Sequence, residues 1–165
     1  MKNNVSDKAV SRGSLNIRKI FRYMMEEGYY PVYEKTHILF NIDDNVAVVE
    51  YDEEILSVRV FFSIEEDAYD LFLEASNATM VGTYLVKPAI LDDMKNIMFS
   101  CEMMCDNLRE LKKFMPKGIS RIKEALEVHK SEMKSLILAE NVSSAAISAA
   151  EDTFISSSKA SKPLS

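Results

Sequence analysis

The sequence predicts an α+β fold in which helices cover an antiparallel five-stranded sheet, in the order α-β-β-β-α-β-β-α. The first observation is the stretch from Tyr29 to Phe62, where apolar and polar residues alternate with the period of half-buried strands. The second is a change to helical spacing on both sides of this stretch. Two acidic turns, residues 43–45 and 52–54, divide the stretch into three strands. Because these links are short, the strands are expected to pair antiparallel.

One helix is expected before the strands. Apolar residues recur at helical spacing from Ile17 to Met24. Ser14 is a suitable N-cap, and Gly28 stands where a left-handed C-terminal residue is common. Pro31 then opens the first strand, because a proline at the start of a strand loses no ladder hydrogen bond.

A second helix and two further strands are expected after Phe62. Ser63 and Glu66 have the spacing of a capping box, and the apolar stripe that follows predicts a helix ending near Asn77. Strand-like residues return over residues 80–86, and clear alternation returns over residues 95–105. These two segments are the predicted fourth and fifth strands.

The rest of the ordered chain is predicted to be helical. Helical spacing predicts one helix from Leu108 to Met115 and another from Pro116 to about residue 139, because proline suits the first turn of a helix. We expect a single domain over residues 14–140 with a flexible N-terminal arm, residues 1–13. Residues 141–165 are rich in Ser and Ala and are expected to form a frayed or disordered tail.

Composition and charge limit the classes of function. The 165 residues contain no apolar run long enough for a membrane span or a signal peptide, so we expect a soluble, cytoplasmic protein without a membrane partner. The net charge of −6 argues against a nucleic-acid partner, since nucleic-acid binders usually carry a basic face. Acidic residues dominate residues 43–74, and basic residues dominate residues 109–134. These segments are expected to be two solvated faces, or alternatively to steer a partner or a second copy.

No motif predicts an enzyme or a cofactor site. The chain has no GxSxG motif, and its four glycines are scattered rather than grouped in a phosphate loop. Cys101 and Cys105 are expected in one strand with their Cα atoms roughly 13 Å apart, so two reduced core thiols are expected rather than a disulfide. With only His37 and His129 besides, a zinc site has too few ligands. We therefore predict no catalytic, cofactor-binding or metal-binding residues.

Three features have alternative interpretations. His129 falls near an apolar stripe and is expected at the edge of the core rather than as a ligand. The carboxylates of residues 43–44 and 65–67 are expected to form a solvated edge, with a weak divalent-cation site as the alternative. The ten methionines are expected to fill the core, with an adaptable binding surface as the alternative.

Four groups of residues resemble the pattern of one family. They are Glu27-Gly28-Tyr29-Tyr30-Pro31 and Ala75-Ser76-Asn77 at two helix ends, Glu102 in a strand, and the run from Leu111 to Pro116 that leads to Glu124-Ala125. With the order of elements, they resemble the YbjN family, whose fold is similar to the type III secretion chaperones, over about residues 15–134. The resemblance implies a bacterial protein without enzymatic activity, a regulator or a chaperone-like adaptor that binds protein segments, often as a dimer. The chain departs from the family pattern in a longer connection that contains Pro88 and in its Ser/Ala tail.

Two functional hypotheses follow. The first is a protein-binding module, an adaptor or regulator with an unidentified protein partner, and the second is a small-ligand sensor with a pocket between sheet and helices. A homodimer is expected, with a monomer as the alternative, because the predicted strand over residues 80–86 is an edge without an interior proline or an inward charge. Met98 and Met104 lie on the parity opposite the core face of their strand. The predicted partner or dimer surface comprises Tyr69, Leu73, Val81, Thr83, Leu85, Met98 and Met104.

Overall fold

The structure, a computed structural model, describes the backbone of residues 15–159 and the side chains of residues 15–141 except that of Glu66. The predicted N-terminal arm, residues 1–13, lies outside the described residues. The elements follow in the order α1 (Ile17–Glu26), β1 (Val32–Glu34), β2 (His37–Ile42), β3 (Asn45–Asp52), β4 (Ile55–Ser63), the 3-10 turn η1 (Glu66–Ala68), α2 (Tyr69–Gly82), β5 (Val86–Ile90), β6 (Asn96–Met104) and α3 (Leu108–Lys159).

The sheet has six strands in the order β1-β2-β3-β4-β6-β5, and every pair of neighbours is antiparallel. The α+β class is therefore confirmed, but the predicted count of five strands is wrong. The first expected strand is divided, because the chain reverses at Lys35 and Thr36 to form the β1–β2 hairpin. Lys35 has a φ of 33°, and positive φ is typical of the short turns that fit the twist of a hairpin.

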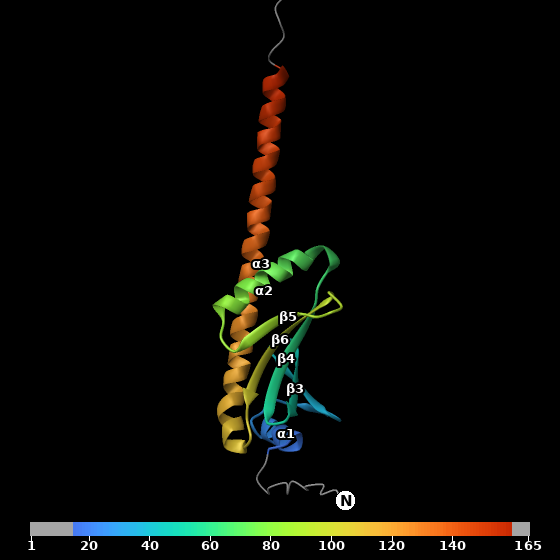
Figure 1. Cartoon of the computed structure of the whole chain (residues 1–165), viewed down its shortest axis with the longest axis vertical. Helices are drawn as coiled ribbons and strands as arrows, with labels where there is room; N and C mark the ends of the chain where they lie inside the picture. The colour runs from blue at the N-terminus through green and yellow to red at the C-terminus, as the bar shows by residue number, and fades with distance from the viewer. Residues whose placement is uncertain (1–14, 160–165) are drawn as a thin grey trace, which may run out of the picture.

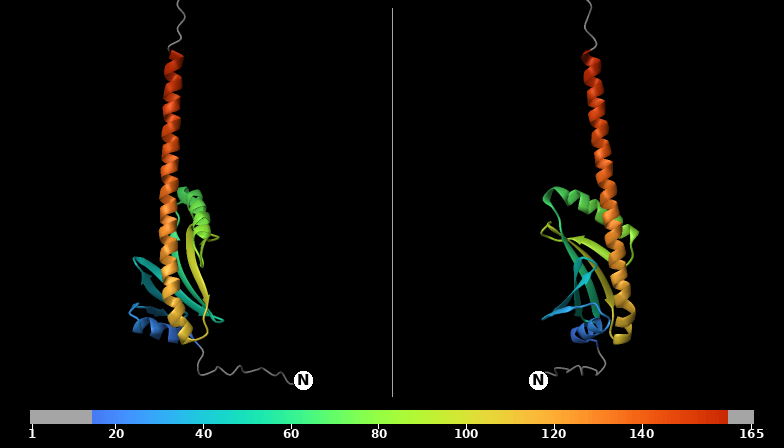
Figure 2. Two further views of the ribbon diagram at one scale, coloured as in Figure 1. Left: turned by 90° about the vertical axis from the view of Figure 1, so that its left-hand side faces the viewer. Right: turned by 180° about the vertical axis from the view of Figure 1, so that it is seen from behind.

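The helices α1 and α3 lie on the same face of the sheet, and α2 crosses α3 at one end of it (Figure 1, Figure 2). Residues of α1 and α3 form one core with the strand residues that point toward them. Phe40, Val58 and Phe99 are all buried in this core, so the alternation predicted for β2, β4 and β6 is confirmed, and Ile122 of the α3 stripe is buried with them.

The predicted strand over residues 80–86 is wrong, because α2 continues to Gly82. Two threonines support this longer helix: the hydroxyl of Thr79 donates to the Ala75 carbonyl at 2.7 Å, and that of Thr83 donates to the Thr79 carbonyl at 2.8 Å. The edge strand is instead β5, which contains Pro88. A proline is tolerated there, since an edge strand does not need every ladder bond. Residues 80–86 therefore do not form the edge strand through which a dimer was expected. The edge strand is β5, and it contains Pro88.

One continuous helix, α3, replaces the two that were predicted. Leu111, Met115, Ile119 and Ile122 are all buried, so one apolar stripe passes through Pro116 without interruption. This packing outweighs the roughly 3 kcal/mol that an interior proline costs a helix. The predicted helix end near residue 139 is also wrong, because α3 continues to Lys159 through most of the expected tail.

The helix caps differ in part from those predicted. Asn16 caps α1, since its Oδ1 accepts the backbone N–H of the residue three positions later at 3.0 Å, whereas Ser14 lies outside the described residues. Gly28 has a φ of 79°, which confirms the predicted left-handed end. The capping box is wrong, because Ser63 is the last residue of β4 and η1 begins after Glu65.

Replacement of Phe40 by Ala is expected to lower the free energy of unfolding by roughly 3 to 5 kcal/mol, because the ring is buried and packs against Tyr29. Leu39 is the matched control, since it precedes Phe40 in β2 but points to the other face and is half-buried. Leu39→Ala should cost clearly less. Urea unfolding of the two variants measures the difference, and equal losses would contradict the assigned faces of β2.

Candidate functional site

No helix of the described residues covers one face of the sheet. The register aligns Leu39, Val48 and Arg59 on three neighbouring strands, and Phe61 lies opposite Met98 on two. These side chains alternate with the buried residues of the same strands, so they point away from α1 and α3. We call this surface the open face. Its apolar members are Leu39, Val46, Val48, Ile55, Phe61, Ala89, Met98 and Met104.

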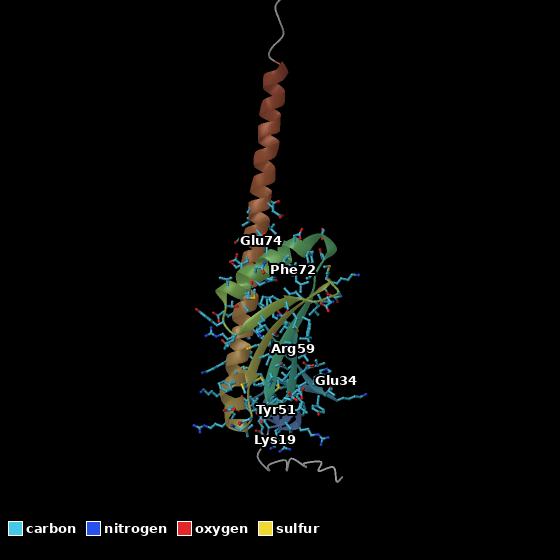
Figure 3. The ribbon with its side chains drawn as sticks, viewed as in Figure 1. Lys19, Glu34, Tyr51, Arg59, Phe72 and Glu74 are labelled. Atoms are coloured by element: carbon cyan, nitrogen blue, oxygen red, sulfur yellow. The ribbon has the colours of Figure 1, made fainter. Side chains whose placement is uncertain are left out.

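Arg59 lies at the centre of the open face and is labelled in Figure 3 over the middle of the sheet. Its guanidinium contacts Glu50 of β3 through Nη1, and its Nη2 is 3.6 Å from Glu102 of β6. The three side chains are partly exposed, so each ion pair is expected to contribute at most about 1 kcal/mol to stability. The ion pairs therefore matter less for stability than for position: they hold one cation between two carboxylates, beside the apolar side chains of the open face.

The end of the open face near the β3–β4 turn is acidic. A shallow depression of about 690 Å³ there is lined by Glu50, Asp52, Glu53 and Glu102, with Lys35 and Arg59 as its basic side chains. The four carboxylates outnumber the two basic side chains, and Arg59 is already paired with Glu50 and Glu102. This end is therefore expected to attract positive charge.

The structure divides the predicted surface residues into separate groups. Met98 and Met104 lie on the open face, and Met104 is 77% exposed. Tyr69, Leu73 and Val81 lie on α2, and Leu85 lies in the connection to β5. Thr83 is buried and donates its hydroxyl to a backbone carbonyl, so it is wrong as a surface residue. The expected joint surface of a strand and a helix is therefore not formed, since residues 80–82 are helical.

Sequence reasoning named Val81 and Leu85 as surface residues, but it placed them in a strand and missed the corner where α2 ends. Met80, Val81, Tyr84 and Leu85 are all exposed there. Leu85 has a φ of 67°, which turns the chain from the helix into β5. The sequence signal was present as large apolar residues around a glycine, but the same pattern is typical of a strand.

A second cavity, of about 450 Å³, lies between the sheet, α2 and α3 on the covered face. Its apolar walls include Phe62, Phe72, Phe99, Leu126 and Met133, and its polar lining residues are Asn45, Ser63, Glu127, His129 and Lys130. Phe72 is labelled next to α2 in Figure 3. We call this space the His129 cavity.

His129 is buried, as its place near the apolar stripe of α3 predicted. Its ring packs against Phe72 and Phe99, with ring centroids 5.6 and 5.1 Å away. Burial lowers the pKa of His129 below its ordinary value, although a hydrogen bond to the Ala75 carbonyl partly opposes this shift. Sequence reasoning expected a pocket between sheet and helices but did not place it beside this ring.

The two cysteines are buried and unpaired, as predicted. Burial is the main cause that raises the pKa of Cys105 to about 11, and it also raises the pKa of Cys101. Both thiols are therefore protonated at neutral pH and poor nucleophiles.

The acidic turn between β2 and β3 contacts the basic helix. The Asp43 carboxylate lies 2.5 Å from Lys123 Nζ of α3, so the two oppositely charged segments meet within one molecule. Within the described part of the chain, no three His, Cys, Asp or Glu side chains are arranged to hold a metal ion. Over residues 15–159, no helix has both the length and the apolar character that crossing a membrane requires.

Comparison with known proteins gives a match in fold only. No protein-family model matches this chain, and no curated protein matches its sequence. Among solved structures it is similar to the crystal structure of YbjN from E. coli, described as a proposed transcription regulator. The TM-score is 0.58 at 9% identity, and the match covers 73% of this chain and 94% of YbjN. The predicted resemblance to YbjN is thus confirmed for the fold, and the likeness to secretion chaperones stays a prediction.

Stability is expected to fall as the pH drops below about 6.5, the ordinary pKa of histidine, because the unfolded chain then binds a proton that the folded His129 resists. The contribution of a group with a lowered folded pKa is present above its unfolded pKa and is lost as the pH falls toward the folded value. Melting temperatures of the wild type and His129→Phe at about pH 7.5 and 5.5 measure this. The wild type should lose more stability than the variant, with His37→Phe behaving like the wild type. Equal losses in all three would contradict the assignment.

Proposed function

We propose that this chain is a non-enzymatic protein-binding module, a chaperone-like adaptor or a regulator, and that the open face binds the partner. The observation that supports this most is an apolar sheet face without a helix over it. Exposed apolar surfaces with polar surroundings mark interaction sites more often than isolated apolar residues do. The fold shared with YbjN, itself described as a proposed regulator, agrees with such a role.

The open face has the features that a protein partner needs. Phe61 and Met98 lie side by side at the register position shared by β4 and β6, and they offer an aromatic anchor next to an adaptable thioether. Ile55 and Met104 pair in the same way at the far end of the same strands. Between these pairs, Arg59 and its two carboxylates supply the polar contacts that fix the orientation of a partner.

Charge indicates the chemistry of the partner. The acidic end of the open face favours a segment whose apolar side chains are flanked by Lys or Arg, and it disfavours nucleic acid. A second copy of this chain is the alternative occupant, because α3 carries Lys117, Lys130 and Lys134 besides the paired Arg121 and Lys123, on a helix long enough to reach a neighbour. Self-association thus remains part of the proposal through the open face, rather than through the strand edge expected over residues 80–86.

A matched pair of variants tests this function. Phe61 is 42% exposed on the open face, and Leu73 is 41% exposed on α2. Both residues accept Glu at the surface with little expected loss of stability. Phe61→Glu should abolish binding of the polypeptides that co-purify with the wild type, whereas Leu73→Glu should retain them. Quantitative mass spectrometry of the bound fractions measures both.

The opposite result would move the interface. If Leu73→Glu loses the partners and Phe61→Glu keeps them, the binding surface is α2 and the proposal for the open face fails. Light scattering on the same proteins measures whether the partner at the open face is a second copy of this chain. A dimeric wild type that becomes monomeric only in Phe61→Glu supports it, and a monomeric wild type excludes it.

A different observation favours the second candidate function, a small-ligand sensor. The His129 cavity lies between the sheet and the helices, which is where a sensor pocket was expected. Its volume of about 450 Å³ is within the range of small-molecule sites. Because the cavity and the open face are on opposite sides of the sheet, one function does not exclude the other.

A further inference from the structure

The geometry of the His129 cavity points to a ligand of one chemical class, an uncharged aromatic molecule that carries a single O–H or N–H donor, such as a phenol or an indole. This inference rests on the second candidate function and is independent of protein binding at the open face. Its argument starts from the hydrogen bonds of the imidazole.

The hydrogen bonds around Thr79 fix the tautomer of His129. The Thr79 hydroxyl donates its only hydrogen to the Ala75 carbonyl at 2.7 Å. Thr79 Oγ1 also lies 3.3 Å from His129 Nδ1, and toward that atom it is therefore an acceptor. The Ala75 carbonyl, which can only accept, also contributes to the electrostatics of this ring. We therefore assign the proton of the neutral imidazole to Nδ1, which leaves a lone pair on Nε2.

That lone pair has no partner among the described residues. His129 is only 7% exposed, and its Nε2 is a buried atom without a hydrogen bond. Buried polar atoms are nearly always paired, and leaving an acceptor unpaired is costly. The ring lines the cavity, but its Nε2 is covered when the cavity is empty, so a donor on a bound molecule would supply the missing hydrogen bond by displacing a neighbouring side chain.

The walls of the cavity select the body of the ligand. Phe62, Phe72 and Phe99 line it, and Phe62 packs edge-on against Phe99 with ring centroids 5.9 Å apart. Aromatic rings pack favourably against such walls in offset or edge-to-face geometry. A charged group would lose its hydration there, since burial already disfavours the charged form of His129 itself.

The charged lining residues do not change this conclusion. Glu127 and Lys130 line the cavity but are exposed, whereas His129 is buried. Their charges are opposite and face solvent, so they do not impose a net charge on a bound molecule. Lysine and glutamate at these positions are therefore expected to affect the affinity of a neutral ligand very little.

Indole and 1-methylindole are suitable probes, because they differ in the N–H donor and have nearly the same ring. The chain contains no tryptophan, so indole fluorescence is separable from that of the protein. Wild-type protein should bind indole saturably and about tenfold more tightly than 1-methylindole, which is the effect of one hydrogen bond to a buried acceptor. The pair p-cresol and toluene should show the same preference in a thermal-shift titration.

His129→Phe keeps an aromatic ring at the site and removes the acceptor. The variant should bind indole only as weakly as 1-methylindole, whereas His37→Phe should keep the wild-type preference. If His129→Phe does not fold, nitrogen NMR of the wild type provides the test, since only two histidines contribute signals. Indole should then shift the Nε2 resonance of His129 and leave His37 unchanged.

Each outcome decides something distinct. Equal binding of indole and 1-methylindole, with protection from melting by both, overturns the ligand class and keeps a cavity that binds apolar molecules. Absence of saturable binding by all four probes overturns the inference and weakens the sensor function as well. Binding that His129→Phe leaves unchanged places the ligand elsewhere and also overturns the inference.

Discussion

Close packing of α3 on β6 is the contact on which the rest of the structure depends. Gly118 lies at this contact: a Cβ there would lie 2.6 Å from Met103 Cε and 3.1 Å from its sulfur, so the end of that methionine would have to move. With no side chain there, the buried stripe of α3 rests directly on the inward residues of the central strands. The gain from burying this stripe is large enough to keep the helix intact through Pro116. The other two described helices pack around this contact. α2 packs against α3, and α1 packs against the remaining inward face of the sheet.

The same contact separates two surfaces with different chemistry. Because α3 and α1 bury one face of the sheet, the outward parity of β3, β4 and β6 is left with apolar side chains and the Arg59 ion pairs. Farther along α3, the stripe reaches His129 at the point where α2 crosses, and packing between the two helices and the sheet is incomplete there. Under the proposed function, the open face would bind a polypeptide and the His129 cavity a small molecule. A ligand that stiffened the α2–α3 crossing would then act on the layer beneath the open face. This is the physical link by which a sensor and an adaptor would be combined in one domain.

Sequence reasoning predicted the parts that depend on long, regular patterns. The alternation through Phe40 and Val58 gave the correct inward face, and the stripe through Ile122 gave the correct face of α3. The errors lie where a local rule was overridden by packing. Pro116 reads as a helix start, yet the stripe around it is buried. Residues 80–82 have strand propensity, yet they continue α2, whose Thr79 is buried beside His129 of α3. Sequence reasoning expected a pocket between sheet and helices and placed Met98 and Met104 outside the core, but it could not locate the open face or the His129 cavity. Each depends on where a helix is absent or incompletely packed, and the spacing of residues does not show this.

The central claim is that α3 covers one face of the sheet and leaves the other free, and the native methionines test it without any substitution. Met104 is 77% exposed on the open face, whereas Met24 and Met115 are fully buried beneath the covered face. Mild oxidation of the folded wild type, followed residue by residue with mass spectrometry, should convert Met104 about as fast as the exposed Met25 on α1. Met24 and Met115 should react only after unfolding. Protection of Met104 together with Met115, or rapid oxidation of Met115 in the folded protein, would contradict the account.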